Sequence, residues 1–196
     1  MSNAAIDYYT VMILLNPYDS DAYFCRGFAY GDKGDYDLAI ADYTEAIRFK
    51  PDYADVYFNR GATYYYKGDY DFAIADYTEA IRLKPDDATA YSNRGDAYSK
   101  KGDCDRAIAD FTKAICLKPI NFDAYYNRGF AYGNKGDYDL AIADFTDAIH
   151  LKPDHIEAYF VRGITYAGLG EHEKANADRQ KCEELHKKRK NSETTK

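Results

Sequence analysis

The chain has 196 residues, of which 22 are Tyr, none is Trp and 46% are hydrophobic, and its formal net charge is −7. This hydrophobic content excludes an intrinsically disordered chain, and the acidic balance argues against nucleic acid or an anionic membrane surface as a partner, since both need clustered cations. The apolar run Val11–Leu15 is far shorter than the roughly 20 residues of a membrane span, so we expect a soluble protein.

The first predicted element is an apolar helix that ends before Pro17. Residues 5–17 align without gaps with residues 39–51, which lie 34 positions later. We therefore assign residues 1–18 to a partial repeat that contains the second helix only. Repeat arrays normally cover such an apolar end, so either the chain is a fragment of a longer array or this end associates with a partner or a second copy. The residues proposed for self-association into a homo-oligomer are Val11, Leu14 and Leu15.

The same spacing of 34 residues runs through the rest of the chain. A fixed period of this length indicates supersecondary units that stack on one another. We predict five full repeats over residues 19–186, the last of which acts as a C-terminal cap. The periodic positions are all five prolines (Pro17, Pro51, Pro85, Pro119 and Pro153) and ten of the 13 glycines, among them Gly27, Gly61, Gly95, Gly129 and Gly163.

Each unit is predicted to form two helices. Apolar residues recur at helical spacing in both halves, and the segment Lys33-Gly34-Asp35 separates them, with Gly34 as a left-handed C-terminal residue and Asp35 as an N-cap. Pro51 ends the second helix because proline forces Lys50 out of the helical region. A glycine inside the first helix costs about 1 kcal/mol relative to alanine, so the recurrence of Gly27 implies that another helix packs closely over it.

The unit resembles the tetratricopeptide repeat. That pattern is present as Tyr23-x-x-Arg26-Gly27-x-x-Tyr30, followed by Ala39-x-x-x-Tyr43 and Pro51, and it covers nearly the whole chain. The resemblance implies an all-α fold in which antiparallel helix pairs stack into a right-handed superhelical solenoid with a concave groove. Two departures recur: Tyr replaces the usual Trp, and an Arg replaces an apolar residue.

The recurring Arg predicts a ladder of ion pairs. A half-buried guanidinium needs a carboxylate partner, and every second helix supplies an Asp at one repeated position. We predict a structural role for these pairs, within or between adjacent repeats. The pairs would join Arg26, Arg60, Arg94, Arg128 and Arg162 with Asp42, Asp76, Asp110, Asp144 and Asp178.

The C-terminal end is predicted to be polar. The last second helix has Asn176, Arg179 and Glu183 where earlier repeats have apolar residues, as a terminal cap requires. Residues 187–196 are predicted to form a basic flexible tail with five cations and one anion, so the rest of the chain has a net charge of −11. The run Lys187–Lys190 has the composition of a nuclear signal or phosphate patch, but a solvated helix end is the better interpretation.

The face that the family turns into its groove is rich in aromatic residues. Aromatic anchors bordered by polar groups are typical of protein interfaces. We predict that this face binds a peptide or helix of a partner, with the asparagines bonding its backbone. The predicted groove residues are Phe24, Phe28, Phe58, Asn59, Tyr65, Tyr66, Asn93, Tyr126, Asn127 and Phe130.

The predicted ligand is neutral or basic. Members of the family that bind chaperones clamp an acidic C-terminal peptide with Lys and with Asn or Arg in this groove. Only Asn59, Asn93 and Asn127 match those positions here, and no basic residue does. The groove should therefore prefer a neutral or basic segment with apolar anchors.

No residue pattern predicts an enzyme, a cofactor or a metal. The four histidines occupy unrelated positions of the repeat, and the cysteines Cys25, Cys104, Cys116 and Cys182 show no CxxC spacing. Scattered cysteines favour free thiols and a cytoplasmic location. The first hypothesis is a protein interaction scaffold; the alternatives are a structural solenoid that self-assembles through its N-terminal helix, and the docking portion of a larger enzyme.

Overall fold

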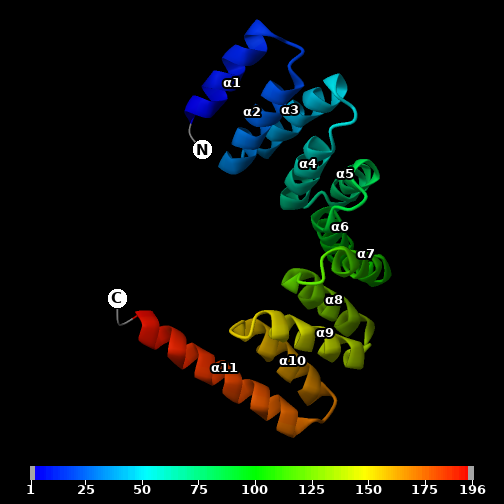
Figure 1. The fold of residues 1–196 in the computed structure, drawn as a ribbon, viewed down its shortest axis with the longest axis vertical. Coiled ribbons are helices and arrows are strands. Elements are labelled where there is room, and N and C mark those ends of the chain that lie inside the picture. Colours follow the sequence, from blue (N-terminus) through cyan, green and yellow to red (C-terminus); the bar gives the residue numbers. More distant parts are fainter. Residues whose placement is uncertain (1–2, 194–196) are drawn as a thin grey trace. The chain divides into compact units, whose positions relative to one another are not determined.

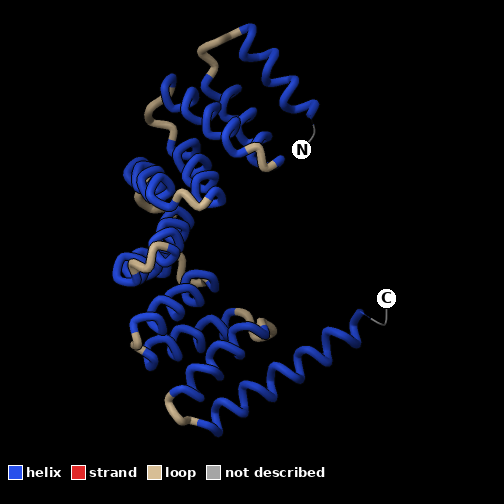
Figure 2. Tube along the Cα trace, turned by 180° about the vertical axis from the view of Figure 1, so that it is seen from behind, coloured by secondary structure: helices blue, strands red, loops and turns tan. Residues whose placement is uncertain are grey.

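The computed structural model describes residues 3–193, which form helices joined by short turns (Figure 2). The chain divides into two compact units, residues 1–101 and 102–196, and each is described by itself. Unit 1 contains α1 (Asn3–Leu15), α2 (Ser20–Lys33), α3 (Tyr36–Phe49), α4 (Ala54–Lys67), α5 (Tyr70–Leu83) and α6 (Ala88–Lys100). Unit 2 contains α7 (Cys104–Leu117), α8 (Phe122–Lys135), α9 (Tyr138–Leu151), α10 (Ile156–Gly168) and α11 (His172–Glu193) (Figure 1).

Within each unit, every helix packs against the next one along the chain. In unit 1 the tightest pairs are α2 with α3 and α4 with α5, and the first helices α2, α4 and α6 also contact one another in sequence. In unit 2, α8 pairs with α9 and α10 with α11. This is the predicted all-α architecture of stacked helix pairs.

Glycine and proline set the helix ends as predicted. Gly34 ends α2 with a left-handed φ of 83°, and its N–H donates to the carbonyl of Gly31 at 2.9 Å. Lys50 leaves the helical region at φ −138° ahead of Pro51. Asp35 occupies the N-cap position of α3, but its side chain makes no capping bond and lies 3.2 Å from the Lys33 ammonium instead.

Small residues let the helices approach closely. Ala39 and Ala46 of α3 are fully buried, and Tyr43 between them is 2% exposed. A methyl group on Gly27 of α2 would lie 3.0 Å from the ring of Tyr43, a spacing that real side chains rarely reach. The prediction that another helix packs over this glycine is confirmed.

Four of the five predicted Arg–Asp pairs are present. Arg60 of α4 donates through Nε and Nη2 to both carboxylate oxygens of Asp76 in α5, at 2.7 and 2.8 Å. The equivalent bonds join Arg26 to Asp42, Arg128 to Asp144 and Arg162 to Asp178. The fifth pair, Arg94 with Asp110, has one member in each unit and stays a prediction.

Each of the five arginines also contacts the preceding repeat, a contact that was not predicted. Arg60 Nη1 donates to the hydroxyl of Thr44 in α3 at 3.0 Å. The guanidinium therefore ties its own helix pair together and links it to the pair before. The other acceptors are Thr10 for Arg26, Thr78 for Arg94, Thr112 for Arg128 and Thr146 for Arg162.

The last helix is longer than expected. Residues 187–193, predicted to be a flexible tail, continue α11 as helix; residues 194–196 lie outside the described part. The segment contains no Gly or Pro, and Glu184 pairs with Lys188 at 2.6 Å and with Lys181 at 2.9 Å. Hydrogen bonds from Lys188 and Lys181 lower the pKa of Glu184 to about 2, so this carboxylate stays ionised and supports the helix.

Candidate binding site

Two adjoining pockets lie along the first helices of unit 1. Ala62 and Tyr66 line both, and we call the two together the tandem pocket. The first has a volume of about 140 Å³ and is lined by Phe28, Gly31, Asp32, Tyr36, Tyr43, Asn59, Ala62, Thr63 and Tyr66. The second has a volume of about 170 Å³ and is lined by Ala62, Tyr65, Tyr66, Tyr77, Asn93 and Asp96.

The small side chain of Ala62 leaves the space for these pockets. It occupies the repeat position that holds Phe28 one repeat earlier and Phe130 two repeats later. A methyl group there fills much less volume than a phenyl ring. Tyr43 and Tyr77, which are 2% and 1% exposed, line the two pockets from the second helices.

Tyr66 lines both pockets and is the most exposed of the predicted groove residues. Its side chain is 70% exposed. The ring stacks on Tyr36 of α3 at a centroid distance of 6.3 Å and meets Tyr65 edge-on at 6.0 Å. These two contacts hold the ring in place, and because it lines both pockets it can contact a ligand in either one.

Tyr65 is positioned by a hydrogen bond rather than free to bind a partner. Its hydroxyl donates to the Asp96 carboxylate of α6. Burial and this bond raise the pKa of Tyr65 well above its ordinary range. The phenol therefore stays protonated and fixes Asp96 in the second pocket.

The tandem pocket has a negative charge. Asp32 lines the first pocket and Asp96 the second, and no Lys or Arg of the described part of the chain lines either. A cationic side chain of a ligand is therefore favoured over an anionic one. Neither carboxylate was predicted as a groove residue: Asp32 has Tyr66 as its register equivalent, and Asp96 stands where other repeats have Phe28 and Phe130.

Two of the three predicted asparagines line the tandem pocket. Asn59 is in the first pocket, where its amide donates to the carbonyl of Asp55 in its own helix at 2.7 Å. Asn93 is in the second pocket beside Tyr77. The third, Asn127, lies half-buried on α8 of unit 2.

Two of the predicted anchors serve mainly to pack the helices. Phe24 is half-buried between Tyr43 and Tyr53, with ring centroids 6.0 and 5.4 Å away. Phe58 is half-buried against Tyr77 at 5.7 Å. Phe28, by contrast, is 37% exposed at the first pocket.

Tyr126 and Phe130 form a separate aromatic cluster in unit 2. Both rings pack against Phe145 of α9, at centroid distances of 6.0 and 5.4 Å. Tyr126 also stacks on Phe122 at 5.4 Å and is half-buried. Phe130 remains 41% exposed, so of this pair it is the ring more open to a ligand.

The predicted self-association residues are exposed on α1. Leu14 and Leu15 are 75% and 77% exposed, and Val11 is 53% exposed. Ile13, which lies between Val11 and Leu14 in the sequence, is buried. The helix therefore packs through one face and presents an apolar face to solvent.

The described residues contain neither a metal-binding cluster nor a membrane-spanning helix. Between residues 3 and 193, no group of His, Cys, Asp and Glu is arranged to hold a metal ion. No helix in that part of the chain combines the length and apolar character needed to cross a bilayer. All four cysteines have free thiols.

Comparisons with known proteins agree with this architecture. The family model for the TPR repeat matches residues 30–67, 61–102 and 95–136, and the tetratricopeptide repeat model matches residues 122–155. A crystal structure of MamA is 30% identical, with a TM-score of 0.82 over 84% of this chain and 96% of that chain. A search of curated proteins found no match.

Two further solved structures show the same fold at lower identity. YrrB, described as a TPR protein with an unusual peptide-binding site, is 23% identical, with a TM-score of 0.78 over 90% of this chain and 91% of its own. MamA from Desulfovibrio magneticus is 20% identical, with a TM-score of 0.82 over 86% of this chain and 96% of its own. Because the family models cover more than half of the sequence and the helix pairs repeat as those models require, the chain belongs to the tetratricopeptide repeat family.

Proposed function

We propose that the chain is a non-catalytic interaction scaffold that binds a segment of a partner protein in the tandem pocket. The observation behind the proposal is Tyr66, a 70% exposed aromatic ring held between two pockets that each contain a carboxylate. An exposed, rigid aromatic residue is the kind of side chain that concentrates binding energy in an interface. Protein binding is also the general role of the repeat family, and a peptide site is described for YrrB.

The preferred segment is basic and has an apolar anchor. Asp32 and Asp96 would each attract a Lys or Arg side chain, and an aliphatic or aromatic side chain would fill the space beside Ala62 against Tyr66. A strongly acidic segment would be repelled because both charged residues of the tandem pocket are carboxylates.

Selection from a random peptide library against the full chain tests this proposal. Enriched peptides should contain Lys or Arg next to an apolar residue, and their affinities should then be measured by calorimetry. Tyr66→Ala should weaken binding at least tenfold, which is typical of the loss of an aromatic anchor. Asp96→Asn should weaken binding less, since it removes the charge but leaves an oxygen to accept the Tyr65 bond.

Two control variants separate the tandem pocket from general surface effects. Tyr18→Ala removes a tyrosine that is 74% exposed and lines neither pocket. Asp86→Asn removes an exposed carboxylate that lies outside both pockets. Both should bind the selected peptides like the wild type. Acidic peptides that lose affinity in Tyr66→Ala, or equal losses in control and pocket variants, would contradict the proposal.

The apolar face of α1 supports self-assembly as a second candidate function. Leu14 and Leu15 are among the most exposed large apolar side chains of the described residues. Exposed apolar side chains gathered on one helix are typical of association surfaces. Light scattering of the wild type should show a mass above that of a monomer, and the variant Leu14→Glu with Leu15→Glu should be monomeric. A monomer in both samples rules this candidate out under the conditions used.

A further inference from the structure

The last repeat lacks an aromatic ring that other repeats have. In three repeats a ring from the second helix lies over the glycine of the first: Tyr43 over Gly27, Tyr77 over Gly61 and Phe145 over Gly129, with ring atoms 3.0, 3.1 and 2.7 Å from the place of a methyl group on the glycine. The residue in register with these rings in the last repeat is Arg179. Around Gly163 the nearest atoms belong instead to Asp178 and Ala175.

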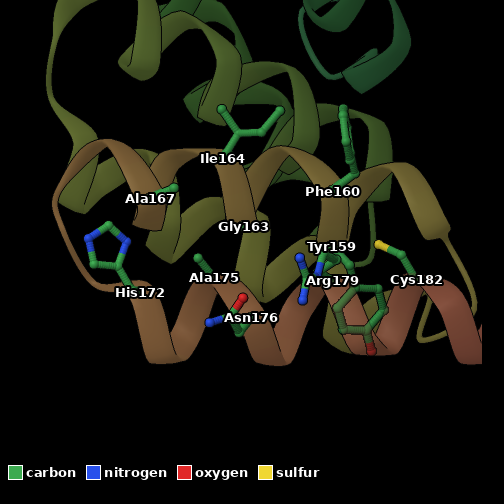
Figure 3. A pocket seen from close by; sticks show the side chains of 10 residues that line it. All are labelled: Tyr159, Phe160, Gly163, Ile164, Ala167, His172, Ala175, Asn176, Arg179 and Cys182. Atoms are coloured by element: carbon green, nitrogen blue, oxygen red, sulfur yellow. The ribbon is translucent and has the colours of Figure 1, made fainter.

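An apolar pocket occupies the place of the missing ring. It lies between α10 and α11 and has a volume of about 310 Å³ (Figure 3). Phe160, Ile164 and Ala167 line it from α10, and Cys182 and Arg179 line it from α11. The volume is ample for an aromatic side chain, and we call this space the α10–α11 pocket.

The residues that would surround such a ring are already in place. In the preceding repeat, Phe145 contacts Tyr126 and Phe130 at centroid distances of 6.0 and 5.4 Å. The register equivalents of these two residues are Phe160 and Ile164, which are 60% and 56% exposed. The last repeat therefore supplies the side chains that surround an aromatic ring in the preceding repeat. Because that ring is Phe145, the pocket should fit an aromatic side chain.

The α10–α11 pocket has the opposite charge to the tandem pocket. Arg179 lines it, and among the described residues no Asp or Glu does. Among the described side chains none forms an ion pair with Arg179. A ligand with a carboxylate near the opening would therefore be attracted.

We propose that the α10–α11 pocket binds an aromatic side chain of a partner segment that has a carboxylate beside the ring. The ring would lie over Gly163 between Phe160 and Ile164, and the carboxylate would pair with Arg179. This site differs from the tandem pocket in its unit and in the charge it prefers, so it extends the proposed function to a second, acidic-aromatic element of a partner.

Titration of the full chain with a minimal probe tests this site. The probe is N-acetyl-L-phenylalanine, which has one ring and one carboxylate, and its amide is the neutral control. The amide resonances of Gly163 and Ile164, followed by ¹⁵N NMR, should shift during the titration. The shifts should give a dissociation constant in the millimolar range, as expected for a ligand of this size. The carboxylate probe should bind several-fold more tightly than the amide.

Two substitutions of Arg179 test the space for the ring and the positive charge separately. Arg179→Phe supplies the ring that Phe145 supplies one repeat earlier, so it should abolish the shifts and raise the thermal midpoint. Arg179→Gln leaves the pocket open and removes the charge, so both probes should then bind equally.

Three results would overturn the proposal. The first is an absence of shifts at Gly163 with either probe. The second is binding that Arg179→Phe leaves unchanged. The third is a dimer that Arg179→Phe dissociates, because a second copy would then occupy the pocket.

Discussion

Arg60 and Asp76 form a two-bond ion pair inside one helix pair, with Nε–Oδ2 and Nη2–Oδ1 distances of 2.7 and 2.8 Å. The two side chains are 17% and 7% exposed. The third guanidinium nitrogen reaches Thr44 in the preceding pair. One side chain therefore holds three helices, α3, α4 and α5, together.

Asp76→Asn should destabilise the protein strongly. It leaves the Arg60 guanidinium largely buried without a counter-charge, and removing one partner of a buried pair costs about 3 kcal/mol. The matched control is Asp37→Asn, which breaks an exposed pair with Lys67 at 2.5 Å in which the carboxylate is 87% exposed. That change should cost less than about 1 kcal/mol. Urea unfolding followed by circular dichroism measures the stability of both variants. Equal unfolding midpoints would show that the buried pair contributes no more to stability than the exposed pair.

Periodicity made the Arg–Asp pairs predictable, because Arg60 and Asp76 both recur every 34 residues and a half-buried Arg requires a carboxylate. Thr44 recurs just as regularly and was still missed. A threonine in a helix can satisfy its hydroxyl on its own backbone, and Thr44 does donate to the carbonyl of Ile40. Its second role, as acceptor for Arg60, depends on how the pairs stack, which the spacing alone does not specify.

Gly129→Ala should destabilise the protein, whereas Gly163→Ala should be much milder. A methyl group on Gly129 would lie 2.7 Å from the Phe145 ring, so the ring must move. Overpacking of this kind costs about 1–3 kcal/mol, against a gain of about 1 kcal/mol in helix propensity. At Gly163 the nearest atom is Asp178 Cβ at 3.2 Å and no ring lies close. Thermal unfolding of the two variants compares them directly, and equal losses would mean that Phe145 does not set the packing at Gly129.

The candidate site was less predictable than the fold. Helical spacing placed Phe24, Phe58 and Tyr66 on one face, but it does not say which rings are covered by a neighbouring tyrosine. Phe24 and Phe58 are covered, and Tyr66 is not. The pockets themselves arise from the small Ala62 next to large neighbours, and such a gap follows from three-dimensional packing rather than from any residue pattern.

Alkaline pH should unfold the protein as its buried tyrosines ionise. Burial raises the pKa of Tyr43 and Tyr77 well above the ordinary value near 10, and burial together with a bond to Asp21 raises that of Tyr53 to about 12. The unfolded chain loses these protons first, so the stabilisation is complete below about pH 10 and is lost as the pH rises from 10 towards 12.

Absorbance at 295 nm and circular dichroism at 222 nm, recorded in one titration, test this behaviour. The late phenolate signal should coincide with the loss of helix. Tyr77→Phe is the matched variant, because Phe111 and Phe145 fill the equivalent position in other repeats. It should shift the alkaline unfolding to higher pH. Ionisation of every tyrosine with the helices intact would contradict the prediction.

Phe58→Ala and Tyr66→Ala should separate packing from recognition. Phe58 is half-buried against Tyr77, so its truncation should cost about 2 kcal/mol, below the range for fully buried rings. For a chain of this size that corresponds to a fall of roughly 4–8 °C in the thermal midpoint. Tyr66 is 70% exposed, and its loss should cost less than about 1 kcal/mol. If calorimetry instead shows Tyr66→Ala unfolding as early as Phe58→Ala, Tyr66 is a packing residue, and weakened peptide binding by that variant would no longer identify it as the anchor.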